Sequence, residues 1–234
     1  MNRTPQVPSG RRRPGPPRTL DVERVVAAAL DLLDAGGPGA LSVRAVAGRL
    51  GVNPNAIYTY VADRRSLECA IVECVLADAG AARLAESGQP WRTQILEYGA
   101  SLREALLRHP GAVPLFMTAP MNGPNALAVG ERLLGAFADA GLAPDDAARA
   151  TYAVIVHVLG SVALEVAETD GRPPLPDEAE RVERRRAGFA SVNLTDHPMT
   201  AATSDVMARW ISTEQFAWTF ERLLDAITRR KATD

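Results

Sequence analysis

The chain has 234 residues, of which 47% are hydrophobic and 23% charged. This is the composition of an ordinary globular protein with one large domain or two modest ones, and it excludes disorder along the whole chain. The longest nearly apolar run, residues 153–164, is far shorter than the roughly 20 residues of a membrane-spanning helix. We therefore expect no membrane partner.

The first twenty residues hold five arginines and several prolines but no apolar stretch, so no signal peptide is predicted. Cys69 and Cys74 lie in one predicted helix, about 140° apart around its axis, and cannot pair with each other. Both observations indicate a cytoplasmic protein in a reducing compartment.

The net charge of −2 hides an uneven distribution. Residues 1–65 carry ten Arg against five Asp or Glu, whereas residues 66–234 carry sixteen basic against twenty-three acidic side chains. A basic front on an acidic body is expected where a small module contacts a polyanion. Residues 1–19 combine five prolines with five arginines and no acid, which predicts a disordered basic arm. Such an arm either contacts DNA or serves as a solubilising tail.

Three short helical patterns follow the arm. The first begins after Asp21 and ends at residues 36–38. The second begins after Ser42 and ends at Gly51, and Asn53 can cap the third. Only about three residues therefore separate the second helix from the third, as in a helix-turn-helix.

Every later pattern is also helical, which predicts an all-α fold. We expect a fourth helix from Asp63 to about Leu84, and further helices at 91–108, 122–140, 144–168 and 204–229. Residues 170–203 are rich in proline and mixed charge. We expect the least ordered part of the body there, with room for one short helix.

Two short helices packed on a preceding helix form the helix-turn-helix arrangement, whose second member enters the DNA major groove. The side chains available here suit contacts to base edges and phosphates. The candidate DNA contacts are Ser42, Arg44, Pro54, Asn55, Ala56, Tyr58, Thr59, Tyr60 and Arg64. We expect Arg44 and Asn55 to read bases, and the hydroxyl groups and Arg64 chiefly to hold phosphates. The alternative is an ordinary three-helix bundle with a polar surface.

Residues 25–67 closely resemble the DNA-binding domain of the tetracycline-repressor (TetR) family of transcriptional regulators. The resemblance is carried by Ala28, Ala29, Leu30, Leu41, Ser42, Arg44, Leu50, Gly51, Val52, Tyr58, Asp63 and Arg64. It implies a DNA-binding domain at 20–66 and a helical domain for ligand binding and dimerisation at 67–234. Members of the family are normally repressors that bind a palindromic operator as homodimers and respond to a small effector. Whether the effector releases or tightens DNA binding is left open by the resemblance.

Residues 91–109 and 111–120 resemble, more weakly, the C-terminal domain of the tetracycline repressors. In that family two long helices of each subunit form a four-helix dimer interface, and by position these would be 144–168 and 204–229. The apolar residues that could supply it are Val154, Val158, Val162, Val166, Trp210, Phe216, Phe220 and Leu224. The same residues would also suit a core within one chain.

Two departures change the expected ligand site. Tetracycline repressors hold their drug as a magnesium chelate through a histidine and an arginine-containing loop, where this chain has Leu115 and Ala119. Neither side chain can coordinate Mg²⁺, so we expect no metal and no cofactor. We expect a mostly apolar pocket for a small hydrophobic or aromatic effector. The candidate ligand contacts are Tyr98, Leu102, Leu115, Phe116, Met117, Met121, His157 and Glu165. For His157, a structural role is the alternative.

The sequence contains no HExxH, paired CxxC, GxSxG or GxxxxGK[ST] motif. These are the short patterns of metalloproteases, metal and redox sites, serine hydrolases and nucleotide-binding proteins, so we expect no enzyme activity. A pure interaction protein with a vestigial DNA-binding domain is the other alternative.

Deleting residues 1–18 tests whether the basic arm contacts DNA. Each lost phosphate contact removes about one unit from the slope of log K against log salt concentration, so the deletion is expected to flatten that slope. Anisotropy titrations of a labelled duplex at several salt concentrations measure it. An unchanged slope would leave only the solubilising tail.

Overall fold

The computed structural model describes residues 20–81, 88–193 and 195–229, and the predicted basic arm lies outside these ranges. All regular structure within them is helical, which confirms the predicted all-α fold. The front of the chain forms α1 (Val22–Gly36), η1 (Pro38–Ala40), α2 (Val43–Leu50), α3 (Pro54–Ile57) and α4 (Arg64–Asp78). The rest forms α6 (Trp91–Arg108), η2 (Pro110–Ala112), α7 (Val113–Thr118), α8 (Pro124–Asp139), α9 (Pro144–Ala167), α10 (Glu178–Phe189), α11 (Pro198–Ala208) and α12 (Thr213–Thr228).

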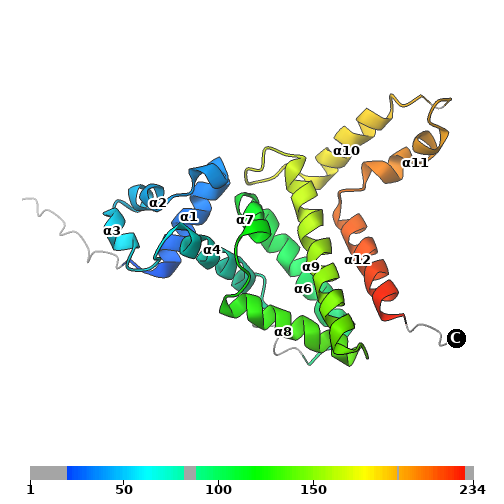
Figure 1. The fold of residues 1–234 in the computed structure, drawn as a ribbon. Coiled ribbons are helices and arrows are strands. Elements are labelled where there is room, and N and C mark those ends of the chain that lie inside the picture. The colour runs from blue at the N-terminus through cyan, green and yellow to red at the C-terminus, as the bar shows by residue number, and fades with distance from the viewer. Residues whose placement is uncertain (1–19, 82–87, 194, 230–234) are drawn as a thin grey trace, which may run out of the picture.

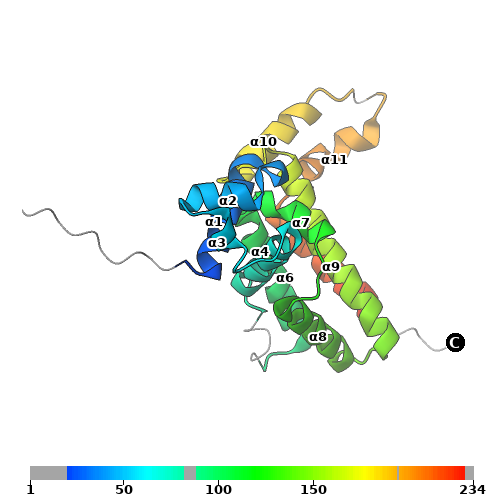
Figure 2. The same ribbon diagram turned by 60° about the vertical axis from the view of Figure 1, so that its left-hand side comes forward.

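The helices form two groups joined by α4. Helices α1 to α3 lie at one end of the molecule, and α4 leads from them to the group around α6, α8 and α9 (Figure 1). Helices α10 and α11 form a hairpin that projects from the second group (Figure 1, Figure 2). The chain is thus an N-terminal helix-turn-helix domain followed by a helical C-terminal domain.

The helices of the front begin at capping side chains, as predicted for Ser42, Asn53 and Asp63. Each cap accepts a hydrogen bond of 2.7–3.0 Å from a backbone N–H of the first turn; the caps are Asp21, Ser42, Asn53 and Asp63. Hydrogen bonds from Ser66 lower the pKa of the Asp63 carboxyl. Gly51 ends α2 with φ of 68°, a backbone conformation that glycine adopts without steric cost.

Three predicted boundaries differ from the structure. Helix α4 ends at Asp78, and residues 82–84 of its predicted range lie outside the described residues. The predicted helix at 204–229 is two helices, because the chain turns at 209–212 and Ser212 starts α12 by accepting a hydrogen bond of 3.1 Å from the Gln215 amide. Residues 170–203, predicted to be the least ordered part, hold α10 and the start of α11.

A buried ionic cluster explains why this charged segment is ordered. Arg103 of α6 and Arg181 of α10 donate to the two oxygens of Glu165 of α9, at 2.7 and 2.5 Å. The three residues are 8%, 5% and 3% exposed, and a buried carboxylate needs such partners. Arg181 is the one buried residue of α10. The hairpin is therefore attached to the body by ion pairs more than by apolar packing.

Most residues predicted for a dimer interface lie in the core of a single chain. The buried ones are Val154, Val158, Val162, Phe216, Phe220 and Leu224. They belong to helices that pack on one another and on α6 and α8, so a core within one chain is the correct interpretation for these six. Val166 is half-buried and Trp210 is exposed. The large apolar side chains that α9 and α12 leave exposed are Tyr152, Val156, Leu164 and Trp218.

Helix α9 is, within the described ranges, the one helix whose length and composition would suffice to cross a membrane. It packs against α6, α8 and α12, with 39% of its most apolar window buried inside the chain. A core helix of a globular protein has the same length and composition, so this feature is weak support for a membrane span.

Glu165→Ala is expected to lower the free energy of unfolding by about 3–5 kcal/mol, because Arg103 and Arg181 would stay buried without their carboxylate. Urea unfolding followed by circular dichroism measures this. Glu180→Ala is the control, since it removes an exposed ion pair with Arg184 and should cost at most about 0.5 kcal/mol. Equal losses for the two variants would contradict the importance of burial.

Candidate functional site

A polar face is built by α2, α3, the turn after α3 and the first turn of α4. Val46 and Ile57 are fully buried, so the other sides of α2 and α3 point outward. The exposed side chains that we call the polar face are Arg44, Asn55, Tyr58, Thr59 and Arg65. Neither of its two arginines makes an ion pair with any described residue. Their N–H donors are therefore available to an external anion.

Helix α3 is shorter than predicted. Its helical residues are Pro54–Ile57, and residues 58–60 form a turn in which the Tyr60 amide donates to the Ile57 carbonyl at 2.9 Å. Thr59 and Tyr60 are therefore not on this helix, and Tyr58 is its C-cap. Pro54 and Ala56 are half-buried, whereas Asn55 is exposed. Both residues predicted to read bases, Arg44 and Asn55, point outward.

Arg64 bonds to other residues of the chain, although about half of its side chain is exposed. Its guanidinium donates to the carbonyls of Leu41 and Pro38 at 3.0 and 3.2 Å and pairs with Glu68 at 2.8 Å. These bonds hold the start of α4 against the segment before α2. The geometry therefore does not support Arg64 as chiefly a phosphate contact, and Arg65 is the better-placed side chain.

Two predicted hydroxyl contacts also have internal partners. The Tyr60 hydroxyl donates to the Leu20 carbonyl at 2.6 Å, which fixes the start of the described chain beside the turn after α3. The Ser42 oxygen accepts from the Ala45 amide at 3.0 Å, and its proton is still available for a phosphate oxygen. Leu20, the first described residue, therefore lies beside the turn that follows α3.

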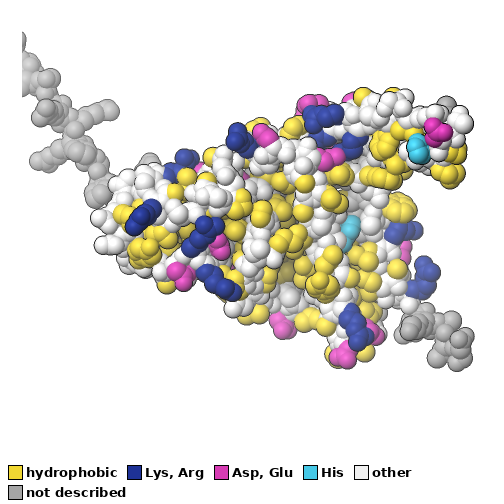
Figure 3. Space-filling model, turned by 45° about the horizontal axis from the view of Figure 1, so that its top comes forward, with side chains coloured by type: hydrophobic (Ala, Val, Ile, Leu, Met, Phe, Trp, Pro, Cys, Tyr) yellow, Lys and Arg dark blue, Asp and Glu magenta, His cyan; other side chains and the backbone are white. Residues whose placement is uncertain are grey.

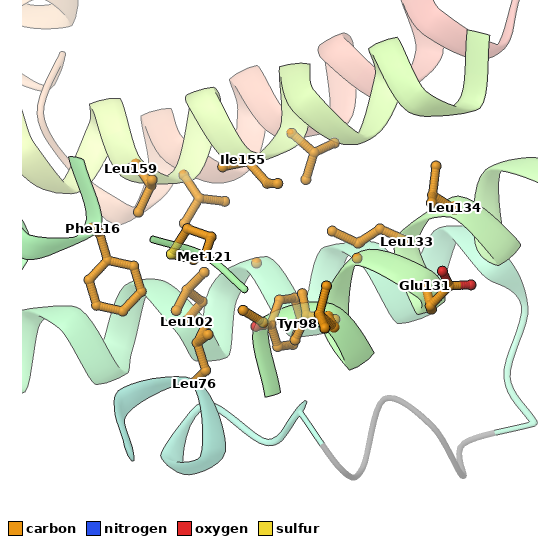
Figure 4. A pocket seen from close by; sticks show the side chains of 17 residues that line it. Leu76, Tyr98, Leu102, Phe116, Met121, Glu131, Leu133, Leu134, Ile155 and Leu159 are labelled. Carbon is orange, nitrogen blue, oxygen red and sulfur yellow. The ribbon is translucent and has the colours of Figure 1, made fainter. Parts of the chain in front are cut away.

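A cavity of about 330 Å³ lies in the second group of helices, where α4, α6, α8 and α9 meet. Side chains point into it from all four helices and from α7 (Figure 4). Those labelled in the figure are Leu76, Tyr98, Leu102, Phe116, Met121, Glu131, Leu133, Leu134, Ile155 and Leu159. The volume and the apolar walls are those of a small-molecule site.

Four of the eight predicted ligand contacts line this cavity: Tyr98, Leu102, Phe116 and Met121. On α7, Leu115 is buried away from the cavity and Met117 is 54% exposed. Successive residues of a helix point about 100° apart, so only Phe116 of these three faces inward. His157 and Glu165 lie on another side of α9 from Ile155 and Leu159 and line a separate cavity of about 160 Å³. These four predicted contacts therefore lie outside the 330 Å³ cavity.

His157 has the structural role that was its alternative. Its ring stacks on Phe216 with centroids 5.0 Å apart, and its Nε2 lies 3.3 Å from the Phe216 carbonyl. Burial lowers the pKa of His157, so the ring is neutral at neutral pH. Both carboxylate oxygens of Glu165 accept hydrogen bonds from arginines within the chain.

Tyr98 and Glu131 are the two lining residues with a hydroxyl or a charge. The Tyr98 hydroxyl is buried and has no hydrogen-bond partner among the described atoms, and burial raises the pKa of this phenol. It therefore stays protonated. Glu131 is exposed at the edge of the cavity. The interior thus contains no charged group, which favours an uncharged occupant.

The sequence interpretation missed the α8 and α9 walls of the cavity, including Gly130, Leu133, Leu134, Ile155 and Leu159. Helical periodicity shows that these positions are apolar or small, but it does not distinguish a side chain that faces a cavity from one that faces the core. Within the described residues, no three His, Cys, Asp or Glu side chains come together as a possible metal site.

Two family models match the chain. Residues 25–67 match the model described as bacterial regulatory proteins, tetR family, and residues 84–230 match the tetracyclin repressor-like C-terminal domain. An HTH-type transcriptional regulator of Saccharopolyspora erythraea is 39% identical over 147 residues, which are 62% of this chain. The chain spans 61% of that relative's length. Tetracycline repressor protein class G of Vibrio anguillarum is 31% identical over 173 residues, with 74% of this chain and 81% of the relative covered.

A solved structure has the same fold. The TetR family protein ActR of Streptomyces coelicolor, in complex with actinorhodin, is similar with a TM-score of 0.72 over 90% of this chain and 96% of that chain. At 24% identity this similarity shows the fold alone.

Replacing Arg64 and Arg65 separately distinguishes a residue that bonds within the chain from a residue that contacts DNA. Arg65→Ala should weaken binding to all duplexes alike and lower the salt slope by about one unit. Arg64→Ala should instead lower the free energy of unfolding by roughly 0.5–1.5 kcal/mol, because two carbonyls and Glu68 lose their donor at a partly exposed site. Asn55→Ala should weaken the free energy of binding to the preferred duplex by about 1–3 kcal/mol and leave binding to other duplexes unchanged.

Duplex titrations and urea unfolding of the three variants provide these comparisons. An Arg64→Ala protein of unchanged stability that loses affinity for every duplex would restore Arg64 as a phosphate contact.

Proposed function

Because the chain belongs to the tetR family of bacterial regulatory proteins, we propose that this transcriptional regulator is a repressor. It binds a palindromic operator as a homodimer. It leaves the operator when a small molecule fills the 330 Å³ cavity. One observation carries the proposal. Helix α4 begins at the polar face, at Arg64 and Arg65, and its Leu76 lines the cavity. A single rigid element therefore reaches from the DNA side to the ligand side.

The proposed domain organisation is the one that the resemblance implies. It consists of the arm at 1–19, the DNA-binding domain at 20–66, and the ligand-binding and dimerisation domain at 67–234. The boundary falls inside α4, which thus belongs to both parts. The relatives are regulators and not enzymes, and we propose no catalytic role. A partner that is chromosomal DNA makes the cytoplasm the proposed location.

The proposed dimer uses the exposed sides of α9 and α12. The α9–α12 face consists of Tyr152, Val156, Leu164, Trp210 and Trp218. Hydrophobic side chains gather on the side of the molecule below the projecting hairpin (Figure 3). Exposed apolar patches of this kind are typical of protein interfaces. One helix-turn-helix contacts only a half-site, so two-fold symmetry is needed to span major grooves about 34–36 Å apart.

The proposed effector is an uncharged hydrophobic or aromatic compound. The lining is almost wholly apolar, and Met121 can adapt to irregular shapes. The Tyr98 hydroxyl is the polar group nearest to such a ligand within the wall. Magnesium has no proposed part, because Leu115 and Ala119 stand where the resemblance places the magnesium-binding groups.

Genome-wide footprinting of the purified full chain tests the proposal as a whole. Protected palindromes whose two half-sites lie about one helical turn apart are expected. Failure to protect any site at nanomolar protein would contradict the DNA-binding function.

Val156→Asp is expected to give monomers that no longer bind a palindromic duplex, because it puts a charge into the α9–α12 face. Ala138→Asp, at an exposed position of α8, is the control and should stay dimeric. Sedimentation measures both. Asp at Val158 or Phe216 would be uninformative, since these side chains are buried within one chain and the variants should unfold. A wild-type monomer at micromolar concentration would refute the dimer.

Gly130→Trp is expected to abolish effector binding. Gly130 lines the cavity, and a side chain there meets open space, so the indole would fill the volume. Gly135→Trp is the control, because Gly135 also faces open space on α8 but does not line the cavity. Planar polycyclic compounds, including actinorhodin, should raise the melting temperature of the wild type and the control only. Stabilisation by tetracycline that requires Mg²⁺ would contradict the proposed ligand class.

A further inference from the structure

Glu73, on α4, holds the first turn of α8. Its carboxylate accepts from the Asn125 amide at 2.6 Å and from the Ala126 amide at 3.1 Å, and the Asn125 side chain donates to the Glu73 carbonyl at 3.1 Å. The first amides of a helix have no partner within it, and the N-cap residue Gly123 provides no side chain. A carboxylate from another helix therefore caps α8.

The contact is tight. A Cβ at Gly123 would overlap the Glu73 side chain, so the approach of the two segments leaves no free space. A displacement of the start of α8 must either move α4 or break three hydrogen bonds, two of them to a charged acceptor.

Helix α8 is also a wall of the cavity. Gly130, Leu133 and Leu134 line it from α8, and Leu76, three residues after Glu73, lines it from α4. An occupant of the cavity would therefore contact the helix that Glu73 holds.

The front domain has a second attachment, made by residues that do not line the cavity. Asp34 of α1 accepts from the Gly111 amide at 3.2 Å and lies 2.9 Å from Nδ1 of His109. A Cβ at Gly111 would overlap the Leu33 carbonyl, so α1 and η2 touch through their backbones. None of these four residues lines the cavity. This contact can stay fixed while α8 moves.

We propose that Glu73 is the positioning residue that couples the cavity to the DNA-binding domain. Displacement of α8 by an occupant pulls α4 through Glu73, and the front domain turns about the contact between Asp34 and Gly111. Arg64 carries the movement of α4 to the segment before α2, since it bonds the Leu41 and Pro38 carbonyls. The inference rests on the proposed function, because it describes how occupancy would change DNA affinity.

Gly130→Trp serves as an occupant that needs no identified ligand. It is expected to weaken binding to a duplex taken from the footprint by about tenfold or more, a typical size for coupling between sites. Gly135→Trp should stay within about threefold of the wild type, the usual scatter of independent substitutions. In the Glu73→Ala background, Gly130→Trp should change affinity by less than about threefold.

Two further variants provide a control on α4 and a conservative replacement of Glu73. Asp78→Ala removes another acid of α4, which pairs with Arg108 of α6, and should leave the effect of Gly130→Trp in place. Glu73→Gln retains one carbonyl acceptor for α8, so it serves if Glu73→Ala fails to fold and should give an intermediate effect. Equal uncoupling by Asp78→Ala, or a full Gly130→Trp effect without the Glu73 carboxylate, would overturn the inference.

The native Cys69, half-buried on α4 between Arg64 and Glu73, gives a readout without DNA. The background variant is Cys74→Ser, so that Cys69 is the one thiol that reacts. Gly130→Trp should change the rate of Cys69 modification by a thiol reagent about threefold or more. This change is expected only when Glu73 is present. A wild type that binds no duplex would refute the proposed function alone. An identical change in the Glu73→Ala background, or no change at all, would refute the coupling.

Discussion

The arrangement of the molecule depends on α4 being shared by two groups of helices. Its 15 residues extend about 22 Å at 1.5 Å per residue. It packs against α1 at the front and against α6, α7 and α8 behind, with Leu67, Ile71, Val72, Val75 and Leu76 buried along one side. Because these side chains belong to one continuous core, the front domain cannot reorient without moving α4.

Polar contacts complement this apolar core at each place where elements must keep a set position. Arg64 fixes the start of α4, Glu73 fixes α8 and Asp34 fixes η2. Apolar packing is non-directional, whereas hydrogen bonds to charged groups have short, defined geometries. The ionic cluster around Glu165 has the same role for the projecting hairpin, whose helix α10 has Arg181 as its one buried residue.

Neighbouring residues of a helix point in different directions and therefore contribute to different parts of the molecule. On α9, Ile155 and Leu159 face the cavity, Val154 and Val158 pack in the wall and core, and Val156 faces outward. One helix thus contributes to the ligand cavity, to the core and to the proposed dimer face. Such sharing means that a ligand acts on elements that also determine assembly, which is a general basis for coupling between sites.

The sequence alone determined the features that depend on neighbours within a few residues. Caps at Ser42, Asn53 and Asp63, the turn at Gly51 and the all-α fold follow from local hydrogen bonding and from the 3.6-residue period. The motif at 25–67 is specific enough to indicate the family by itself. The four cavity residues Tyr98, Leu102, Phe116 and Met121 were predicted from the resemblance and from their chemical character.

Tertiary structure decided everything that depends on a distant partner. The periodicity of α9 and α12 marks apolar positions, but only packing separates Val158 and Phe216, which are buried within the chain, from Val156 and Trp218, which are exposed. The sequence likewise offers Arg64 and Arg65 as equal donors, and only the positions of the Leu41 and Pro38 carbonyls give Arg64 partners within the chain. The physical reason is that a side chain's free energy is set by the atoms around it, and these come from segments far away in the sequence.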